Sequence, residues 1–366
     1  MRTLYQYLFT KMPLVRSNAD GMLYLLTEEE RGRIMRVQYV AIGVSVLFSV
    51  IGFVLLYLPQ YNFKAFFMPT NVDLPYFGRV ALPIVTTVYG VVLMVVEIML
   101  LTLLHLSTVQ RIAAITGYLG ADMHQNDNIK TVLDVSLEVK SRSQEALGLD
   151  PYQDLNPILV FGYNFLLRLK GWLGSVVIKW FLSRMLGRFA VREVLDFSGL
   201  PIYAFLNGYA TYRLLREARV VIMGQHLIER VLQSIDFQEI KYDGFENLIY
   251  DTLQFIVINK RDYHHNHYIL AKNVLSACDI PPRAQYKLRD DYYTHLAAAP
   301  QATQRCCILL IHLGFLLDGE LSLRERTTIQ TLRKKGLITE NINDVLLYLK
   351  SFLAGDGMQN LLIRYA

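Results

Sequence analysis

Two long stretches of the chain carry almost no charged side chain. Residues 37–63 contain none, and residues 80–110 contain only Glu97. Because about 20 apolar residues are enough for a helix to cross a bilayer, each stretch is long enough to span one. The pattern therefore predicts two transmembrane helices, at about 37–58 and 80–106, joined as a hairpin.

The segment before the first apolar stretch does not look like a cleavable signal peptide. Residues 1–36 carry six basic and four acidic side chains rather than a short basic tip. We therefore expect an uncleaved anchor. Thr27 and Glu30 have the spacing of a capping box, so a helix is expected to begin there and to continue into the first span.

The basic residues near the ends of the two spans indicate their orientation, because short basic loops stay in the cytoplasm. Arginines lie before the first span and after the second: Arg31, Arg33, Arg36 and Arg111. The connector at 59–79 has only Lys64 and Arg79. This bias predicts a multi-pass protein of the bacterial inner membrane with both termini in the cytoplasm. The connector is rich in proline and aromatic residues, so we expect a short loop lying against the membrane.

Small residues recur at helical spacing in both predicted spans. They are Ala41, Ser45 and Ser49 in the first span, and Thr86 and Gly90 in the second. Small residues four positions apart let helices approach closely in a membrane, which favours packing of the two spans or of two copies of the chain. The alternative is that they are the small residues common in any membrane helix.

The segment at 155–192 mixes apolar runs with basic side chains, so none of its runs reaches spanning length. Arg184, Arg188 and Arg192 repeat every four residues and form one basic helical face, and Trp172 and Trp180 lie nearby. A basic face, an apolar face and tryptophans are typical of a helix lying in the membrane surface. An amphipathic helix packed on the rest of the protein is the alternative.

Residues 197–212 form a further charge-free run, which Pro201 and Gly208 interrupt. A run this short is marginal for a span, so the pattern favours a buried or re-entrant helical hairpin.

The surrounding segment, residues 183–225, resembles the EcsC-like bacterial membrane-associated proteins. The matching elements are Arg188, Gly199–Pro201, Asn207 and Ala218–Arg219. The resemblance implies membrane association and supplies no catalytic residue.

The chain after residue 236 has the pattern of a helical domain. Its first helix is expected at 245–256, with one apolar face formed by Phe245, Leu248, Ile249, Leu253 and Ile256. The apolar run at 306–317, which contains His312, is too short to span a membrane and predicts a core helix. The sequence of this region has no glycine-rich phosphate loop, no GxSxG and no HExxH, so we expect a protein that is not an enzyme.

Three carboxylates lie close together in "LLDGELSLRER", residues 316–326. Asp318-Gly319 is typical of a turn, and Ser322 with Glu325 forms another capping box. The helix that follows is expected to run to about Lys335, with Gly336 as the residue just past its end.

The longer segment "LIHLGFLLDGELSLRERTTIQTLRKKGL" resembles TerB-like domains, which are all-helical, cytoplasmic and found in tellurite-resistance and stress-linked bacterial systems. The resemblance implies that Asp318, Glu320 and Glu325 could hold a divalent cation. Where a second acidic loop would be expected, the sequence "INKRDYHHNHYILAK" keeps Asp262 but has basic residues and histidines instead. This departure disfavours the cation site.

The same "HHNH" suggests a transition-metal site. His264 and His267 would share a helix face, with Asp262 nearby. Zinc needs three or four ligands, and no second group of ligands stands out in the sequence. The alternative is a polar helix start on the protein surface.

Glu97 is the most unusual residue of the predicted spans. An ionisable group near the middle of a membrane helix is costly, which makes it a candidate functional residue. It could hydrogen-bond between helices in the neutral form and fix an oligomer, carry protons or ions, or be tolerated beside a polar cavity.

The composition adds three limits. A formal net charge of +5 is mild, so we expect no nucleic-acid partner. The three cysteines, Cys278, Cys306 and Cys307, are too few for a disulfide framework and suit a reducing compartment. We expect no cofactor, and a divalent cation at the acidic stretch is the one alternative considered.

The sequence as a whole predicts an all-α protein in four parts. These are a cytoplasmic N-terminal helix (1–36), a transmembrane hairpin (37–106), a basic amphipathic EcsC-like region (107–235) and a TerB-like domain (236–366). The expected function is non-enzymatic: anchoring a cytoplasmic helical domain that recruits a partner protein or serves an envelope or stress response. The expected partners are membrane lipids, a further copy of the chain and an unidentified protein. The alternative is an oligomeric subunit that conducts ions or protons through Glu97.

Overall fold

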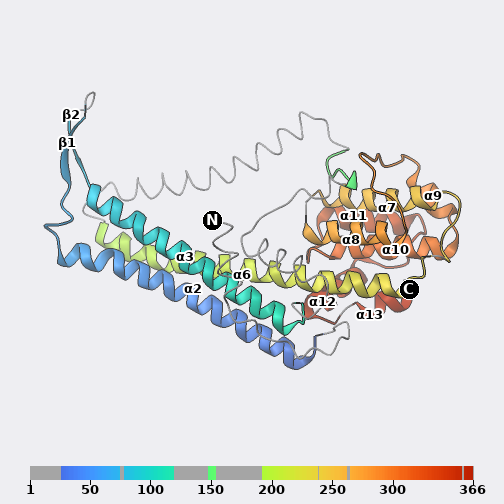
Figure 1. The fold of residues 1–366 in the computed structure, drawn as a ribbon, viewed down its shortest axis with the longest axis horizontal. Helices are drawn as coiled ribbons and strands as arrows, with labels where there is room; N and C mark the ends of the chain where they lie inside the picture. Colours follow the sequence, from blue (N-terminus) through green and yellow to red (C-terminus); the bar gives the residue numbers. More distant parts are fainter. Residues whose placement is uncertain are drawn as a thin grey trace. The chain divides into compact units, whose positions relative to one another are not determined.

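The computed structural model describes residues 26–74, 78–118, 147–153, 192–237, 239–261, 264–356 and 358–365. Within these ranges every regular element is a helix except for one two-stranded hairpin (Figure 1). The described chain divides into two compact units. The apolar unit contains residues 35–111 and 192–215, and the globular unit contains residues 26–34, 112–118, 147–153 and everything from 216 onward.

Two long helices confirm the two apolar stretches predicted from the sequence. Helix α2 (Glu28–Asn62) and helix α3 (Ile84–Ile115) are both long and apolar enough to cross a membrane. They lie side by side, and the Tyr89 hydroxyl of α3 donates to the Leu55 carbonyl of α2 at 2.8 Å (Figure 1). The predicted capping box is also present, because Glu30 N donates to Thr27 Oγ1 and Thr27 N donates to Glu30 Oε2.

The connector between these helices is partly a β-hairpin rather than only a loop. Strands β1 (Thr70–Leu74) and β2 (Gly78–Leu82) pair antiparallel, with Val72 opposite Val80. The second helix therefore begins at Ile84 and not at residue 80. In the first strand Val72 and Leu74 alternate with Asn71 and Asp73, which is a short strand signal that the proline and aromatic content obscured.

Helix α6 (Arg192–Ser234) shows that the predicted hairpin at 197–212 is wrong, because the helix continues through both Pro201 and Gly208. A proline removes one backbone hydrogen bond, and neighbouring helices can compensate for that loss. Gly208 serves close packing instead of a turn. A Cβ at this position would lie only 3.0 Å from Val46 Cγ2 of α2.

The globular unit is built around one buried helix, α10 (Gln301–Leu316), which confirms the core helix predicted at the apolar run. Helix α7 (Phe245–Lys260) packs against it, and a Cβ at Gly314 of α10 would lie 2.3 Å from Ile256 Cγ2 of α7. The five apolar residues predicted to face the core from α7 are all buried, and so is most of the rest of that helix. The other helices are α8 (His265–Ala277), α9 (Tyr292–Ala298), α11 (Leu323–Lys334), α12 (Ile342–Ala354) and α13 (Gln359–Tyr365).

The start of α11 confirms the capping box predicted in the acidic stretch. Glu325 N donates to Ser322 Oγ at 3.3 Å, and Ser322 N donates to Glu325 Oε2 at 2.7 Å. Gly319 and Gly336 have φ angles of 77° and 72°, a region that favours glycine. The turn before the helix and the residue that ends it are thus both as expected.

Candidate functional site

Glu97 lies at the centre of a polar cluster in the apolar unit. The Tyr203 hydroxyl donates to Glu97 Oε2 at 2.7 Å, and Asn207 Nδ2 donates to Glu97 Oε1 at 2.8 Å. Asn207 Nδ2 also lies 2.8 Å from Ser49 Oγ and donates to it. Ser49, Glu97, Tyr203 and Asn207, here called the Glu97 cluster, thereby join α2, α3 and α6.

The arrangement of the three helices explains why these residues meet. Tyr203 and Asn207 are four positions apart on α6, so they lie on one face and reach the same carboxylate. Further along, about two turns after Glu97 on α3 and one turn after Asn207 on α6, His105 Nε2 and Thr211 Oγ1 lie 3.0 Å apart. Residue numbers on α3 and α6 increase together along these contacts, so the two helices are parallel.

The small residues of α2 lie where helix α6 approaches. Ala41, Ser45 and Ser49 are all buried, and each lies four residues after the one before. Gly208 of α6 approaches this stretch of α2 closely, with a Cβ position 3.7 Å from Ile42 Cγ2. Of the two small residues in α3, Gly90 lies beside α2, where its Cβ position is 3.8 Å from Leu56 Cδ1. Thr86 is half-buried.

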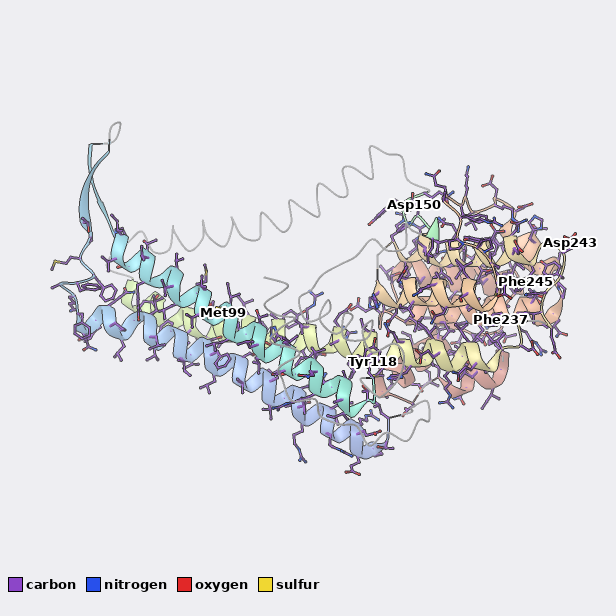
Figure 2. All side chains as sticks on the ribbon, in the orientation of Figure 1. Met99, Tyr118, Asp150, Phe237, Asp243 and Phe245 are labelled. Atoms are coloured by element: carbon purple, nitrogen blue, oxygen red, sulfur yellow. The ribbon has the colours of Figure 1, made fainter. Side chains whose placement is uncertain are left out.

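The surface around the Glu97 cluster is apolar and uncovered. Figure 2 shows side chains standing out along α2 and α3, and Met99 of α3 is 46% exposed. None of the side chains in the most apolar stretch of α3 is buried. On α6, Phe205 and Leu206 are exposed as well. These helices therefore present to their surroundings the kind of side chain that elsewhere forms a protein core.

The three carboxylates of the acidic stretch are paired with basic side chains of the globular unit. Lys260 Nζ lies 2.7 Å from Asp318 Oδ1 and 2.6 Å from Glu325 Oε1, and Arg216 lies 3.1 Å from Glu320 Oε1. Burial raises the pKa of Glu325, and the charge of Lys260 opposes that shift. The lysine ammonium thus occupies the position next to the acids that a bound cation would need.

The histidines of "HHNH" have separate structural contacts. His264 caps α8 by accepting a hydrogen bond from Asn266 N, and its Nε2 lies 3.0 Å from Glu217 Oε1. His267 Nε2 lies 2.8 Å from the Gly314 carbonyl oxygen. The residues that the structure describes contain no group of three or more histidine, cysteine, aspartate or glutamate side chains that could hold a metal ion. Asp262 lies outside the described residues.

The cysteines are also unsuited to nucleophilic chemistry. All three are buried and free, and burial raises the pKa of Cys278 and of Cys307 to about 12 each. The pKa of Cys306 is raised for the same reason. Because the thiolate is the reactive form, these side chains act as core residues.

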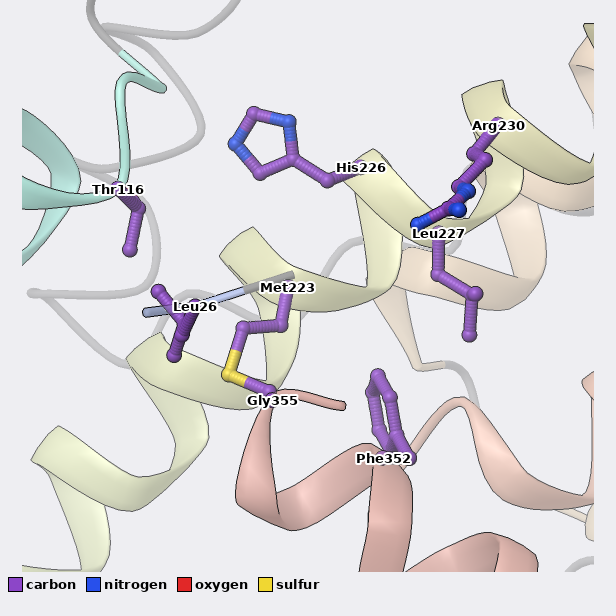
Figure 3. Close-up of a pocket in the computed structure, with 8 residues that line it drawn as sticks. All are labelled: Leu26, Thr116, Met223, His226, Leu227, Arg230, Phe352 and Gly355. Carbon is purple, nitrogen blue, oxygen red and sulfur yellow. The ribbon is translucent and has the colours of Figure 1, made fainter. Parts of the chain in front are cut away.

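A small pocket lies beside α6 in the globular unit (Figure 3). Its volume is about 20 Å³, which is room for about one water molecule. Burial lowers the pKa of His226, one of its lining residues. The pocket is too small to enclose an organic ligand. It is lined by Leu26, Thr116, Met223, His226, Leu227, Arg230, Phe352 and Gly355.

Part of the predicted membrane-surface face is not described by the structure. Trp172, Trp180, Arg184 and Arg188 lie outside the described residues, and only the backbone of Arg192 is described, as the first residue of α6. The membrane-surface helix therefore stays a prediction.

Sequence reasoning did not identify the partners of Glu97. They were sought in the first two spans, whereas Tyr203 and Asn207 come from a third helix about 100 residues further along the chain. A tyrosine and an asparagine four positions apart in a charge-free run were the available signal. Because that run was interpreted as an interrupted hairpin, Tyr203 and Asn207 were not expected to share one face of a continuous helix.

Comparison of the chain with protein-family models, with curated proteins and with solved structures finds no match.

Proposed function

We propose that this protein is a non-enzymatic membrane anchor of the bacterial inner membrane. Helices α2 and α3 cross the bilayer, and a cytoplasmic helical domain of TerB-like type recruits a partner protein in an envelope or stress response. The observation that carries the proposal is the uncovered apolar surface of α3, whose most apolar stretch has no buried side chain. Leaving that much apolar surface in water would be very unfavourable, whereas lipid covers it without cost.

Three further observations support a binding role over catalysis. The acidic stretch is paired with Lys260 and Arg216, His267 contacts the Gly314 carbonyl oxygen, and burial keeps the thiols protonated. Among the described residues of the globular unit, the cysteines therefore supply no nucleophile and the acidic stretch supplies no free carboxylate pair. The resemblance of residues near 318 to TerB-like domains supports the type of domain.

The test of the anchor has two stages. Membranes carrying the full-length protein are washed at alkaline pH, which removes peripheral proteins, and the proposal requires the protein to stay in the pellet until detergent is added. Recovery in the wash would overturn the proposal.

Topology is then tested with cysteine variants and a membrane-impermeant maleimide. Lys64→Cys in the connector is expected to react in intact cells, and Lys350→Cys only after lysis, because both positions are exposed and the native cysteines are buried. The reverse order of labelling would contradict the predicted orientation.

One observation favours a second function, conduction of protons or ions. Polar side chains continue from the Glu97 cluster to the His105–Thr211 pair along the contact of α3 with α6. Two or three helices form a pore only by oligomerising, so conduction requires an assembly. Proton flux into vesicles that is lost in Glu97→Gln while the assembly persists would support this function, and a monomer in detergent would count against it.

A further inference from the structure

Among the residues that the structure describes, the carboxylate of Glu97 has no cationic partner. Among the described residues no lysine, arginine or histidine forms an ion pair with it, and its polar contacts are those with Tyr203 and Asn207. The apolar stretches 37–63, 80–110 and 197–212 contain no lysine or arginine at all. A second copy of these helices therefore brings no basic side chain to this level of the bundle.

The cluster nevertheless fixes the position of the Glu97 carboxylate. Both oxygens accept a hydrogen bond, one from the Tyr203 hydroxyl and one from the Asn207 amide. These donors fix the direction of the carboxylate and leave each oxygen a further lone pair.

The carboxylate lies near the surface of the apolar unit, since the Tyr203 side chain that donates to it is 42% exposed. Gly52 of α2 lies next to it, and a Cβ at that position would be 3.6 Å from Glu97 Oε2 with nothing else but the Glu97 carboxyl carbon within 4 Å. Glu97 itself is half-buried, and two chain neighbours of this contact are exposed: Ile51 before Gly52 and Ile98 after Glu97. The Glu97 carboxylate therefore lies within an apolar surface. The α2 residue beside its Oε2 atom is Gly52, which has no side chain.

We propose that the Glu97 cluster is a docking site for a membrane helix of another protein that carries a lysine or arginine within its apolar span. A charged residue at that depth is unfavourable on either helix alone, and pairing the two charges removes both penalties. The apolar faces of α2 and α3 supply the surface on which such a helix packs, and Tyr203 and Asn207 supply the orientation. This inference rests on the proposed function, since it requires α2 and α3 to lie in a membrane.

The test uses the full-length protein in phosphatidylcholine vesicles and a defined probe. The probe is a synthetic leucine–alanine helix of about 23 residues, long enough to span, with one central lysine. A matched peptide has glutamine in its place. Binding is measured by energy transfer between a dye on the peptide and a dye on Lys64→Cys. The lysine peptide is expected to bind about tenfold more tightly than the glutamine peptide, in line with a charge-assisted contact.

Three variants locate the contact. Glu97→Gln is expected to bind both peptides equally. Gly52→Leu is expected to weaken the lysine peptide, because its side chain fills the space beside Oε2. Gly43→Leu is the matched control, since its Cβ position has nothing within 4 Å, and it should keep the preference for lysine.

The outcomes separate this inference from the proposed function. A protein that resists alkaline extraction from the vesicles but does not distinguish the two peptides would overturn the docking site alone and indicate a neutral Glu97. A preference for lysine that survives in Glu97→Gln or in Gly52→Leu would also overturn it. Release of the protein by the alkaline wash would overturn the anchor and the docking site together.

Discussion

The globular unit and the apolar unit treat buried acidic side chains in opposite ways. Among the described residues of the globular unit, each fully buried carboxylate has a basic partner: Asp251 with Arg289, Glu325 with Lys260 and Glu340 with Arg364. In the apolar unit Glu97 receives two hydrogen bonds and no cation among the described residues. The globular unit thus pairs its buried carboxylates with basic side chains, whereas the described part of the apolar unit supplies Glu97 with hydrogen bonds alone.

The two units also differ in how far their apolar side chains are buried. Helix α10 is buried within the globular unit, whereas α2 and α3 leave long apolar faces uncovered. The globular unit therefore buries its apolar helix internally, whereas the apolar unit leaves its apolar faces uncovered. Four changes test this difference, in order of decreasing expected effect on the stability of the globular unit.

The largest effect is expected for Lys260→Met. The lysine side chain is 3% exposed and neutralises Asp318 and Glu325, so its loss leaves buried carboxylates unpaired. We expect a loss of about 3–5 kcal/mol of unfolding free energy, measured by denaturant titration in detergent with hydrogen exchange of α7 and α11. Adding Glu325→Gln should restore part of it. A loss of less than about 1 kcal/mol is typical of a surface ion pair. Such a result would contradict the claim that Lys260 neutralises a buried carboxylate.

The next effect is expected for Gly314→Ala, because the added Cβ would lie 2.3 Å from Ile256 Cγ2. Overpacking of this kind costs about 1–3 kcal/mol, measured by the same titration. The cost should be smaller when Ile256→Ala is present, since that change removes the clashing atoms. Gly32→Ala is the control, because nothing lies within 4 Å of its Cβ position and no loss is expected there.

A smaller effect is expected from pH, through His312 of α10. Burial lowers the pKa of His312 from its ordinary value of 6.5, although the charge of Glu340 opposes the shift. The unfolded chain therefore binds more protons than the folded chain just below pH 6.5, so stability should fall as the pH falls from about 7 to 5. His312→Phe should flatten this dependence, measured as hydrogen exchange of α10 at each pH. An identical pH dependence in both proteins would show that other groups cause it.

The smallest effect is expected for Glu97→Gln. Glutamine has nearly the same shape and can still accept from Asn207, so the stability of the globular unit should change by less than about 0.5 kcal/mol. The same denaturant titration measures it beside Lys260→Met. A loss of several kcal/mol would mean that Glu97 is an internally compensated residue, and the contrast between the two units would no longer hold.

Local signals in the sequence predicted much of the fold. The two apolar helices, the core helix around His312 and the capping boxes at Thr27 and Ser322 are all present. Each depends on residues within one or two helical turns of each other. The hairpin expected at 197–212 was wrong because that prediction also relied on local signals alone. Pro201 and Gly208 are local signals for a break, but packing of Gly208 against α2 keeps the helix intact.

The candidate site could be predicted only in part. Glu97 stood out because a single charge in a long apolar run is visible in the sequence. The acidic stretch stood out equally, yet Asp318 and Glu325 are neutralised by Lys260, which is about 60 residues away. No local pattern shows such a distant partner. The sequence therefore could not distinguish a carboxylate that binds a metal cation from one that forms an ion pair with a lysine.

By itself, the sequence determined the character of each segment: which stretches are apolar throughout, where helices begin, and that one acid lies among apolar residues. Those features follow from composition and spacing over a few residues. Only the tertiary structure decided which acids are compensated, because that depends on basic side chains and helices brought together from distant parts of the chain. It placed Lys260 beside Glu325, and among the described residues it placed Tyr203 and Asn207, but no basic side chain, beside Glu97.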